Sequence, residues 1–202
     1  VVPLAMGTVL EIGIGTGLNL PYYDATRVDG GIGLDPSQAS WNLDSERAAH
    51  LAFEVEFIGL PGEQIPLADG SVYTVLVTFA LCTIPDPVTA LQGMARVLRP
   101  GGSLLFCEHG AAPDANVRQW QNRINPLWRR IAGGCNLNRA IPGLLQQGGF
   151  SIADMQTSYL PSTPRFGVLN LTCTISVVSS GGDVGWIYVH LADIFTVRSS
   201  PG

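Results

Sequence analysis

Three glycines at alternate positions follow a short apolar segment near the start of the chain. The segment Val9–Ile12 is typical of a buried strand, and the glycines are Gly13, Gly15 and Gly17. Glycine lets the backbone turn sharply and approach a ligand with no Cβ in the way. Such a loop is found where nucleotide-like ligands bind at the carboxyl edge of a parallel sheet. An ordinary tight turn would use the same residues, so the loop alone is weak support for a site.

An acidic residue at the end of this segment narrows the choice of ligand. The dinucleotide pattern is G-x-G-x-x-G, but here Leu18 stands where the third glycine belongs. The carboxylate of Glu11 would repel a pyrophosphate and would favour a ligand that carries an ammonium group. S-adenosylmethionine is such a ligand, because it joins adenosine, a sulfonium and an amino-acid tail without phosphate. An NAD(P)-dependent oxidoreductase is the alternative class.

A second acid supports a nucleoside ligand. Asp35 follows the apolar segment 31–34 and lies 22 residues after Gly13 (35 − 13). About 20 residues is the spacing of the acid that accepts hydrogen bonds from a ribose in nucleotide-binding folds. A helix cap before Pro36 is the structural alternative.

Composition bounds the class of protein. The 202 residues are 46% hydrophobic and 13% charged, which predicts one compact domain over residues 1–178 and a tail of unknown role over 179–202. The net charge of −5 disfavours nucleic-acid binding. All eleven basic residues are arginine, which excludes Schiff-base lysine chemistry. The four cysteines are widely spaced, which favours a reduced, cytoplasmic location and predicts no metal site.

No apolar run reaches the ~18 residues that would span a bilayer. Weak membrane association stays open, and the sequence does not indicate an oligomeric state.

Strand and helix patterns alternate along the chain. Further strands are expected at 31–35, 53–57, 72–80 and 103–107, and at the C-terminal end over 150–159 and 166–178. Helices are expected at 18–23, 37–50, 86–98, 116–131 and 141–147. This order predicts an α/β fold with a doubly wound, mostly parallel Rossmann-like sheet, helices on both faces and a C-terminal antiparallel hairpin.

Several segments together resemble the class I S-adenosylmethionine-dependent methyltransferases. The loop at 9–17, Gly33-Leu34-Asp35-Pro36-Ser37 and the turn Leu98-Arg99-Pro100-Gly101-Gly102 look like motifs of that class. Leu81-Cys82-Thr83-Ile84-Pro85-Asp86 and Glu108-His109-Gly110 look most like the thiol methyltransferases and the quinone-biosynthesis methyltransferases. The resemblance covers residues 2 to 165.

The resemblance implies a placement for the cofactor S-adenosylmethionine. Glu11 and the glycine loop would face the methionine tail, Asp35 the ribose, and Gly62 with Glu63 the adenine. The residues near the sulfonium would be Thr78, Leu81 and Cys82. The methyl acceptor would be a small hydrophobic molecule, either a thiol or a quinone-like ring.

The chain also departs from the class. Helices that normally precede the first strand do not precede Val9 here, so we expect upstream residues to be missing. Val72-Tyr73 replaces a usual Phe-Asp, and the resemblance is lost after about Asn170. A non-catalytic remnant that binds the cofactor is therefore a further alternative.

His109 is the candidate catalytic residue, as a base or as a group that orients the acceptor. An equally good explanation is a hydrogen-bonded turn histidine. Methyl transfer from a sulfonium needs positioning more than acid–base chemistry, so no catalytic triad is expected. Trp120 and Trp128 are candidates for an acceptor pocket or for the core, and the helix that carries them is expected to bury its apolar side.

Overall fold

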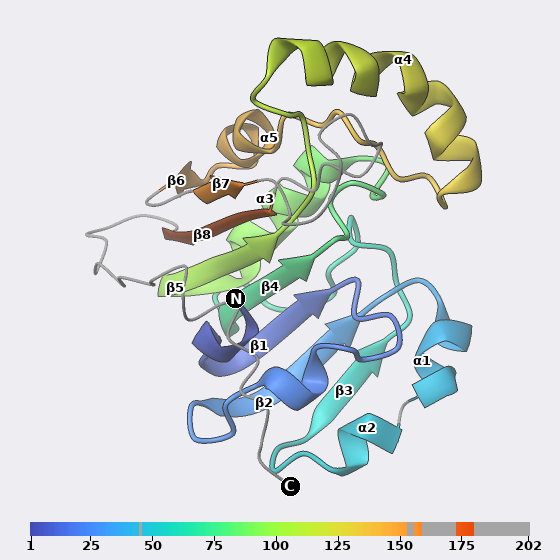
Figure 1. Cartoon of the computed structure of the whole chain (residues 1–202). Helices are drawn as coiled ribbons and strands as arrows, with labels where there is room; N and C mark the ends of the chain where they lie inside the picture. Colours follow the sequence, from blue (N-terminus) through green and yellow to red (C-terminus); the bar gives the residue numbers. More distant parts are fainter. Residues whose placement is uncertain (45, 153–155, 159–172, 180–202) are drawn as a thin grey trace, which may run out of the picture.

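The computed structural model describes residues 1–44, 46–152, 156–158 and 173–179. Its sheet has the strand order β3-β2-β1-β4-β5-β8-β6, with β7 paired to β8 (Figure 1). The strands are β1 (Gly7–Ile12), β2 (Val28–Leu34), β3 (Val55–Ile58), β4 (Val72–Thr78), β5 (Leu98–Cys107), β6 (Ser151–Ile152), β7 (Gln156–Ser158) and β8 (Cys173–Ser179).

The first five strands are parallel, and β8 runs antiparallel to β5, β6 and β7. The predicted α/β fold with a parallel Rossmann-like sheet is therefore confirmed. The strand order reverses between β1 and β4, which places a crevice at the carboxyl ends of these two strands. Residues 180–202 of the predicted tail lie outside the described residues, and Ser179 ends β8. The described parts of the predicted strands at 150–159 and 166–178 form β6, β7 and most of β8, and their other residues lie outside the described part of the chain.

One face of the sheet carries the main core. Strand side chains alternate between the faces, so that Leu10 and Ile12 of β1 point to this side, whereas Val9 points to the other. The helices α3 (Pro87–Val97) and α5 (Ile141–Gln147) cover this face with Leu91, Met94, Ile141 and Leu145.

The second face is covered by shorter segments. These are η1 (Val2–Leu4), η2 (Leu20–Tyr22), α1 (Gln38–Asp44) and α2 (Glu46–Ala49). Trp41 stacks on Phe57 with ring centroids 5.1 Å apart and anchors α1 to β3. The helix predicted at 18–23 is reduced to the single 3₁₀ turn η2, and the segment 37–50 forms two short helices instead of one.

The helix α3 begins as predicted. Asp86 is its N-cap and accepts a hydrogen bond from the main-chain N–H of Thr89, and Pro87 is the first helical residue. The strand after α3 starts earlier than predicted, at Leu98 instead of Ser103, because Leu98 already pairs with Val72 of β4.

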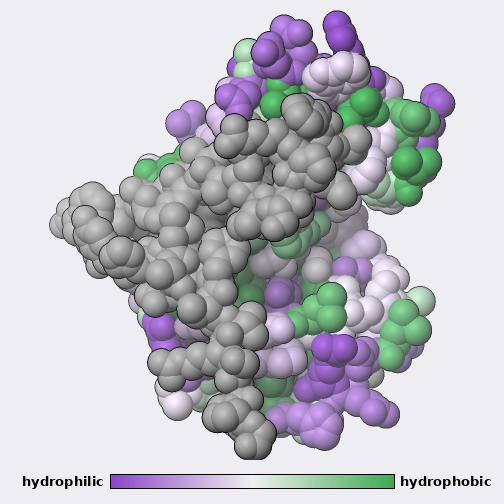
Figure 2. Space-filling model, viewed as in Figure 1, coloured by the Kyte–Doolittle hydropathy of each residue, from purple (hydrophilic) through white to green (hydrophobic). Residues whose placement is uncertain are grey.

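The long helix α4 (Ala115–Ile131) runs on through Pro126 and lies beyond the carboxyl ends of β4 and β5 (Figure 1). The prediction that its apolar side is buried was wrong. Trp120, Leu127 and Ile131 are exposed, with exposed fractions of 59%, 64% and 72%. Figure 2 shows hydrophobic and hydrophilic residues mixed over this part of the surface.

The buried side of α4 is polar. Gln121 accepts a hydrogen bond from the main-chain N–H of Ala112 and donates to the carbonyl of Gly110, and Asn125 accepts from the N–H of Leu137. These side chains satisfy the backbone of the loops after β5 and α4, which would otherwise be buried without partners.

Among the described residues, no helix combines the length and the apolar character needed to span a membrane.

Candidate functional site

The glycine loop adopts a backbone conformation that only glycine takes without strain. Gly13, Gly15 and Gly17 have φ values of +75°, +54° and +75°. A Cβ on Gly13 would lie 2.6 Å from the Cβ of Ala80, so the loop also packs directly against the segment after β4. The structure thus brings the ends of β1 and β4 together, as a ligand crevice requires.

Glu11 lies behind this loop and is almost fully buried, with 3% of its surface exposed. Its two carboxylate oxygens accept hydrogen bonds from the Tyr23 hydroxyl at 2.7 Å and from the Asn19 amide at 2.8 Å. Burial raises the pKa of Glu11 to about 7, although both hydrogen bonds lower it. No cation faces Glu11 among the described ion pairs, so an ammonium group of a ligand would supply the missing positive charge.

Asn19 and Tyr23 were missed in the sequence. Both lie in the irregular connection between β1 and β2, where no periodicity marks them. Asn19 also donates to the hydroxyl oxygen of Thr78 at 2.8 Å, and this contact joins Glu11 to the end of β4. Thr78, predicted from the resemblance, therefore lies two hydrogen bonds from Glu11.

Asp35 lies at the end of β2 and fixes two loops. Its Oδ2 accepts from the main-chain N–H of Gly15 at 3.1 Å, and its Oδ1 accepts from that of Ser37 at 2.8 Å. A carboxylate offers about four acceptor positions, so two remain for the hydroxyls of a ribose. The hydrogen bond to Gly15 places Asp35 beside the glycine loop, and its contact with a ribose stays a prediction.

Gly62 and Glu63 lie beside the segment after β4. A Cβ on Gly62 would be 2.9 Å from Ile84, and Glu63 accepts a hydrogen bond from the main-chain N–H of Asp86 at 3.0 Å. The contact of these residues with adenine stays a prediction.

Glu108, at the end of β5, is fully buried and organises the segment after β4. Its Oε1 accepts hydrogen bonds from the main-chain N–H groups of Ala80 at 2.6 Å and Leu81 at 2.8 Å. Burial raises the pKa of Glu108 to about 7 against these hydrogen bonds. Leu81 and Cys82 are consequently held in a buried position next to β5.

We expect Glu108→Ala to lower the free energy of unfolding by about 2–4 kcal/mol, because two buried N–H groups lose their acceptor. Glu108→Gln keeps an acceptor oxygen and should cost less than about 1 kcal/mol. Because the pKa of Glu108 is raised, its contribution to the free energy of unfolding is fully present below pH 4.5. This contribution is lost as the pH rises through about 7. Urea unfolding of both variants at pH 5 and 8 measures this, and equal losses for alanine and glutamine would contradict it.

His109 points to a cysteine. Its Nε2 lies 2.7 Å from the Sγ of Cys135, and its Nδ1 is buried without a partner among the described residues. Burial lowers the pKa of His109, so the ring is neutral at pH 7. Phe79, whose ring lies 5.9 Å from that of His109, has a φ of +53°, a strained value of the kind that gathers at functional sites.

The wide spacing of the cysteines predicts no metal site, yet the fold brings three possible metal ligands together. Ligand atoms of Cys82, His109 and Cys135 lie within 4.8 Å of one another. Cys135 lies 26 residues after His109 along the chain, so local spacing does not reveal this cluster. Trp120 lies on the surface, with the guanidinium of Arg123 5.5 Å from its ring centroid, so it lines no pocket in the described residues.

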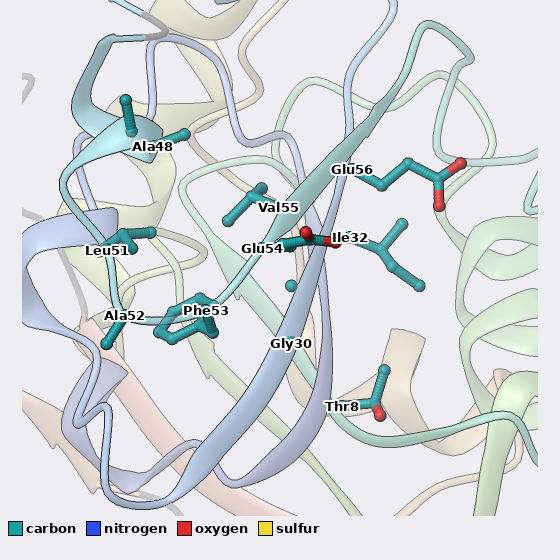
Figure 3. A pocket seen from close by; sticks show the side chains of 12 residues that line it. Thr8, Gly30, Ile32, Ala48, Leu51, Ala52, Phe53, Glu54, Val55 and Glu56 are labelled. Carbon is teal, nitrogen blue, oxygen red and sulfur yellow. The ribbon is translucent and has the colours of Figure 1, made fainter.

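An open pocket of about 860 Å³ lies elsewhere, between β2 and the segment that leads into β3 (Figure 3). It is lined by Thr8 and Gly30 near the starts of their strands, and by Phe53, Glu54 and Glu56. None of the predicted cofactor residues lines it. Because ligands of parallel α/β sheets bind at the carboxyl ends of the strands, we do not place the cofactor there.

Known proteins resemble this chain in sequence and in fold. Residues 10–106 match the family described as a methyltransferase domain. Human thiol S-methyltransferase TMT1B is 38% identical over 154 residues, which are 73% of this chain and 62% of that protein. The demethylmenaquinone methyltransferase of Paenarthrobacter aurescens is 28% identical over 138 residues, which are 67% of this chain and 47% of that protein.

Two solved structures share the fold. The YcgJ protein of Bacillus subtilis has a TM-score of 0.68 at 18% identity, and the match covers 88% of this chain and 94% of that one. A geranyl diphosphate methyltransferase in complex with S-adenosylmethionine has a TM-score of 0.66 at 14% identity and covers 87% and 79%.

The glycine loop, the two acids and these matches make the chain similar to the class I S-adenosylmethionine-dependent methyltransferases. Within the class, the chain is similar to thiol S-methyltransferases and spans 62 to 65% of the length of four of them. The nicotinamide alternative is not supported.

Proposed function

We propose that this chain binds S-adenosylmethionine at the carboxyl ends of β1, β2 and β4 and transfers its methyl group to a small hydrophobic thiol. The observation that carries the proposal is the buried Glu11 carboxylate behind a glycine loop that is tied to Asp35. A thiol is favoured over a quinone-like ring because the thiol S-methyltransferases match at 34 to 38% identity, whereas the demethylmenaquinone methyltransferase matches at 28%.

The residues present fit the cofactor. Glu11 would pair with the ammonium group of the methionine tail, the glycine loop would approach its carboxylate with main-chain N–H groups, and Asp35 would accept from the ribose. The cofactor supplies a methyl group that is already activated by the sulfonium. The chain would therefore contribute orientation and the exclusion of water.

The segment Leu81–Cys82 would form the apolar floor of the reaction site. A neutral His109 next to it would orient the acceptor or take the proton of its thiol. A free thiol has a pKa of about 8.5, so only modest help is needed near neutral pH.

Methylation of a panel of small thiols, followed by mass spectrometry, tests the acceptor. We expect transfer to apolar thiols and none to their alcohol analogues. Calorimetry with S-adenosylhomocysteine is measured alongside. Tight binding without methylation of any thiol or quinone would point to the non-catalytic alternative, and absence of binding would refute the cofactor site itself.

Asp35→Ala should weaken the affinity for S-adenosylhomocysteine by about 100-fold, because the ribose loses its acceptor and the N–H of Gly15 loses its anchor. Asp35→Asn keeps one acceptor oxygen and should lose less. The exposed Asp114, the N-cap residue of α4, serves as the control as Asp114→Asn, because asparagine is an equally good N-cap. Equal affinities for the alanine variant and the unmodified chain would remove Asp35 from the site.

We further propose a domain over residues 1–178, a cytoplasmic location and a small-molecule partner.

A further inference from the structure

We propose that Cys82, His109 and Cys135 form a binding site for a zinc ion. Their ligand atoms lie within 4.8 Å of one another, although the residues come from three separate segments of the chain. Both cysteines are free thiols and are buried, with exposed fractions of 1% and 7%. Two sulfurs and one imidazole nitrogen are a ligand set that zinc prefers.

The backbone that carries these side chains is fixed before any ion binds. Glu108, the neighbour of His109, holds the N–H groups of Ala80 and Leu81, which directly precede Cys82. Asn136, the neighbour of Cys135, donates both its main-chain N–H and its side-chain amide to the carbonyl of Cys82, each at 2.9 Å. The three ligands are thus joined by hydrogen bonds between their immediate neighbours, and little ordering would be needed on binding.

The distances suit a tetrahedral ion after a small adjustment. Zinc bonds of about 2.3 Å to sulfur and 2.0–2.1 Å to nitrogen separate neighbouring ligand atoms by about 3.5 Å. The 2.7 Å between His109 Nε2 and Cys135 Sγ is shorter, so one of these side chains would withdraw by about 0.8 Å. This shift is within the reach of a χ1 adjustment.

Charge favours an ion over a plain cysteine–histidine contact. Two thiolates neutralise a divalent ion, so the bound site would be neutral in its buried surroundings. Glu108 and Arg139 are the other charged groups near Cys82, and their charges oppose each other.

Three protein ligands leave a fourth position open, which is the arrangement of catalytic and not of structural zinc sites. The inference does not depend on the proposed methyl transfer. It does limit the role of His109 in that reaction, because a ring nitrogen that binds zinc cannot also serve as the base.

The test is cobalt and zinc binding by the purified chain, stripped of metal under reducing conditions. We expect roughly one ion per chain and, with Co²⁺, an intense near-ultraviolet thiolate-to-metal absorption. Zinc should also raise the thermal unfolding midpoint. His109→Gln and Cys135→Ser should each weaken zinc affinity by more than about 100-fold, whereas the exposed His50→Gln should not.

Circular dichroism of each variant without metal shows whether it is folded. A folded, unmodified chain that binds no cobalt through thiolate, or folded His109 and Cys135 variants that bind as tightly as the unmodified chain, would overturn the proposal. S-adenosylhomocysteine binding is measured on the same samples. Loss of the metal site with retained cofactor binding separates failure of this inference from failure of the proposed function.

Discussion

Glu11→Gln is expected to lower the affinity for S-adenosylhomocysteine by about 100-fold at pH 8. Glutamine keeps the shape of the side chain and an oxygen for its partners, but it removes the negative charge. A buried hydrogen bond to a charged group contributes about 1.5–3 kcal/mol, and each 1.4 kcal/mol is a factor of ten in affinity. Glu11 is buried, and no cation of the described ion pairs neutralises its charge, so the glutamine variant would leave a ligand ammonium without this partner.

In the same variant, the affinity for S-adenosylhomocysteine should no longer depend on pH. The pKa of Glu11 is raised to about 7 in the free protein, so below that pH a proton must leave before an ammonium can be paired. The affinity of the unmodified chain should therefore rise between about pH 5.5 and 7.5, towards the limit of tenfold per unit. The affinity of Glu11→Gln should stay flat, because the amino group of the ligand, with a pKa near 8, is charged over this range.

Stability separates this effect from damage to the fold. Because the pKa of Glu11 is raised, its buried carboxyl group is protonated below pH 4.5 and contributes fully to stability there, and this contribution is lost as the pH rises through about 7. At pH 8 the glutamine variant should thus be at least as stable as the unmodified chain while it binds the ligand far less. Glu54→Gln is the matched control, since Glu54 is exposed on the way into β3. Unchanged affinity in Glu11→Gln would place the ammonium elsewhere.

The sequence was sufficient for the parts of the site that follow local patterns. Alternate glycines after a strand and an acid about 20 residues later predicted that Gly15 and Asp35 belong to one ligand site, and the structure places them in hydrogen-bond contact. Both features are short-range consequences of a strand–loop–helix unit, so neither needs knowledge of the tertiary fold. The N-cap at Asp86 was predictable for the same reason.

Residues that act through contacts distant in the sequence were not predictable. Cys135 meets His109 because Asn136 is tied to the carbonyl of Cys82, and no periodicity encodes that bond. The amphipathic pattern of α4 predicted the wrong buried side for a related reason. The backbone groups of two buried loops needed hydrogen-bond partners, and Gln121 and Asn125 turn inward to supply them.

Gly13→Ala is expected to lower the free energy of unfolding by about 2–4 kcal/mol and to abolish measurable cofactor binding. Two costs add. A non-glycine residue at a φ of +75° is strained by about 1 kcal/mol, and the new Cβ would lie 2.6 Å from the Cβ of Ala80, where no flexible side chain can give way. Relief would require the loop to move away from β4 and would open the crevice.

Gly101 separates the two costs. It has a φ of +78°, yet nothing lies within 4 Å of the Cβ that alanine would add. Gly101→Ala should therefore cost only about 1 kcal/mol and leave cofactor binding intact. Equal losses of stability in Gly13→Ala and Gly101→Ala, measured by urea unfolding, would show that the contact with Ala80 does not destabilise the variant.

A second substitution tests the contact itself. Ala80→Gly removes the atom that the new Cβ would strike, so Gly13→Ala combined with Ala80→Gly should be more stable than the sum of the single losses predicts, by about 1–2 kcal/mol. Strain from the φ of residue 13 would persist, and the double variant should still unfold more easily than the unmodified chain. If cofactor binding returns together with this stability, ligand binding depends on the distance between the ends of β1 and β4. If stability returns without binding, the conformation of the loop at residue 13 matters on its own, because only glycine presents its N–H groups to the ligand in that geometry.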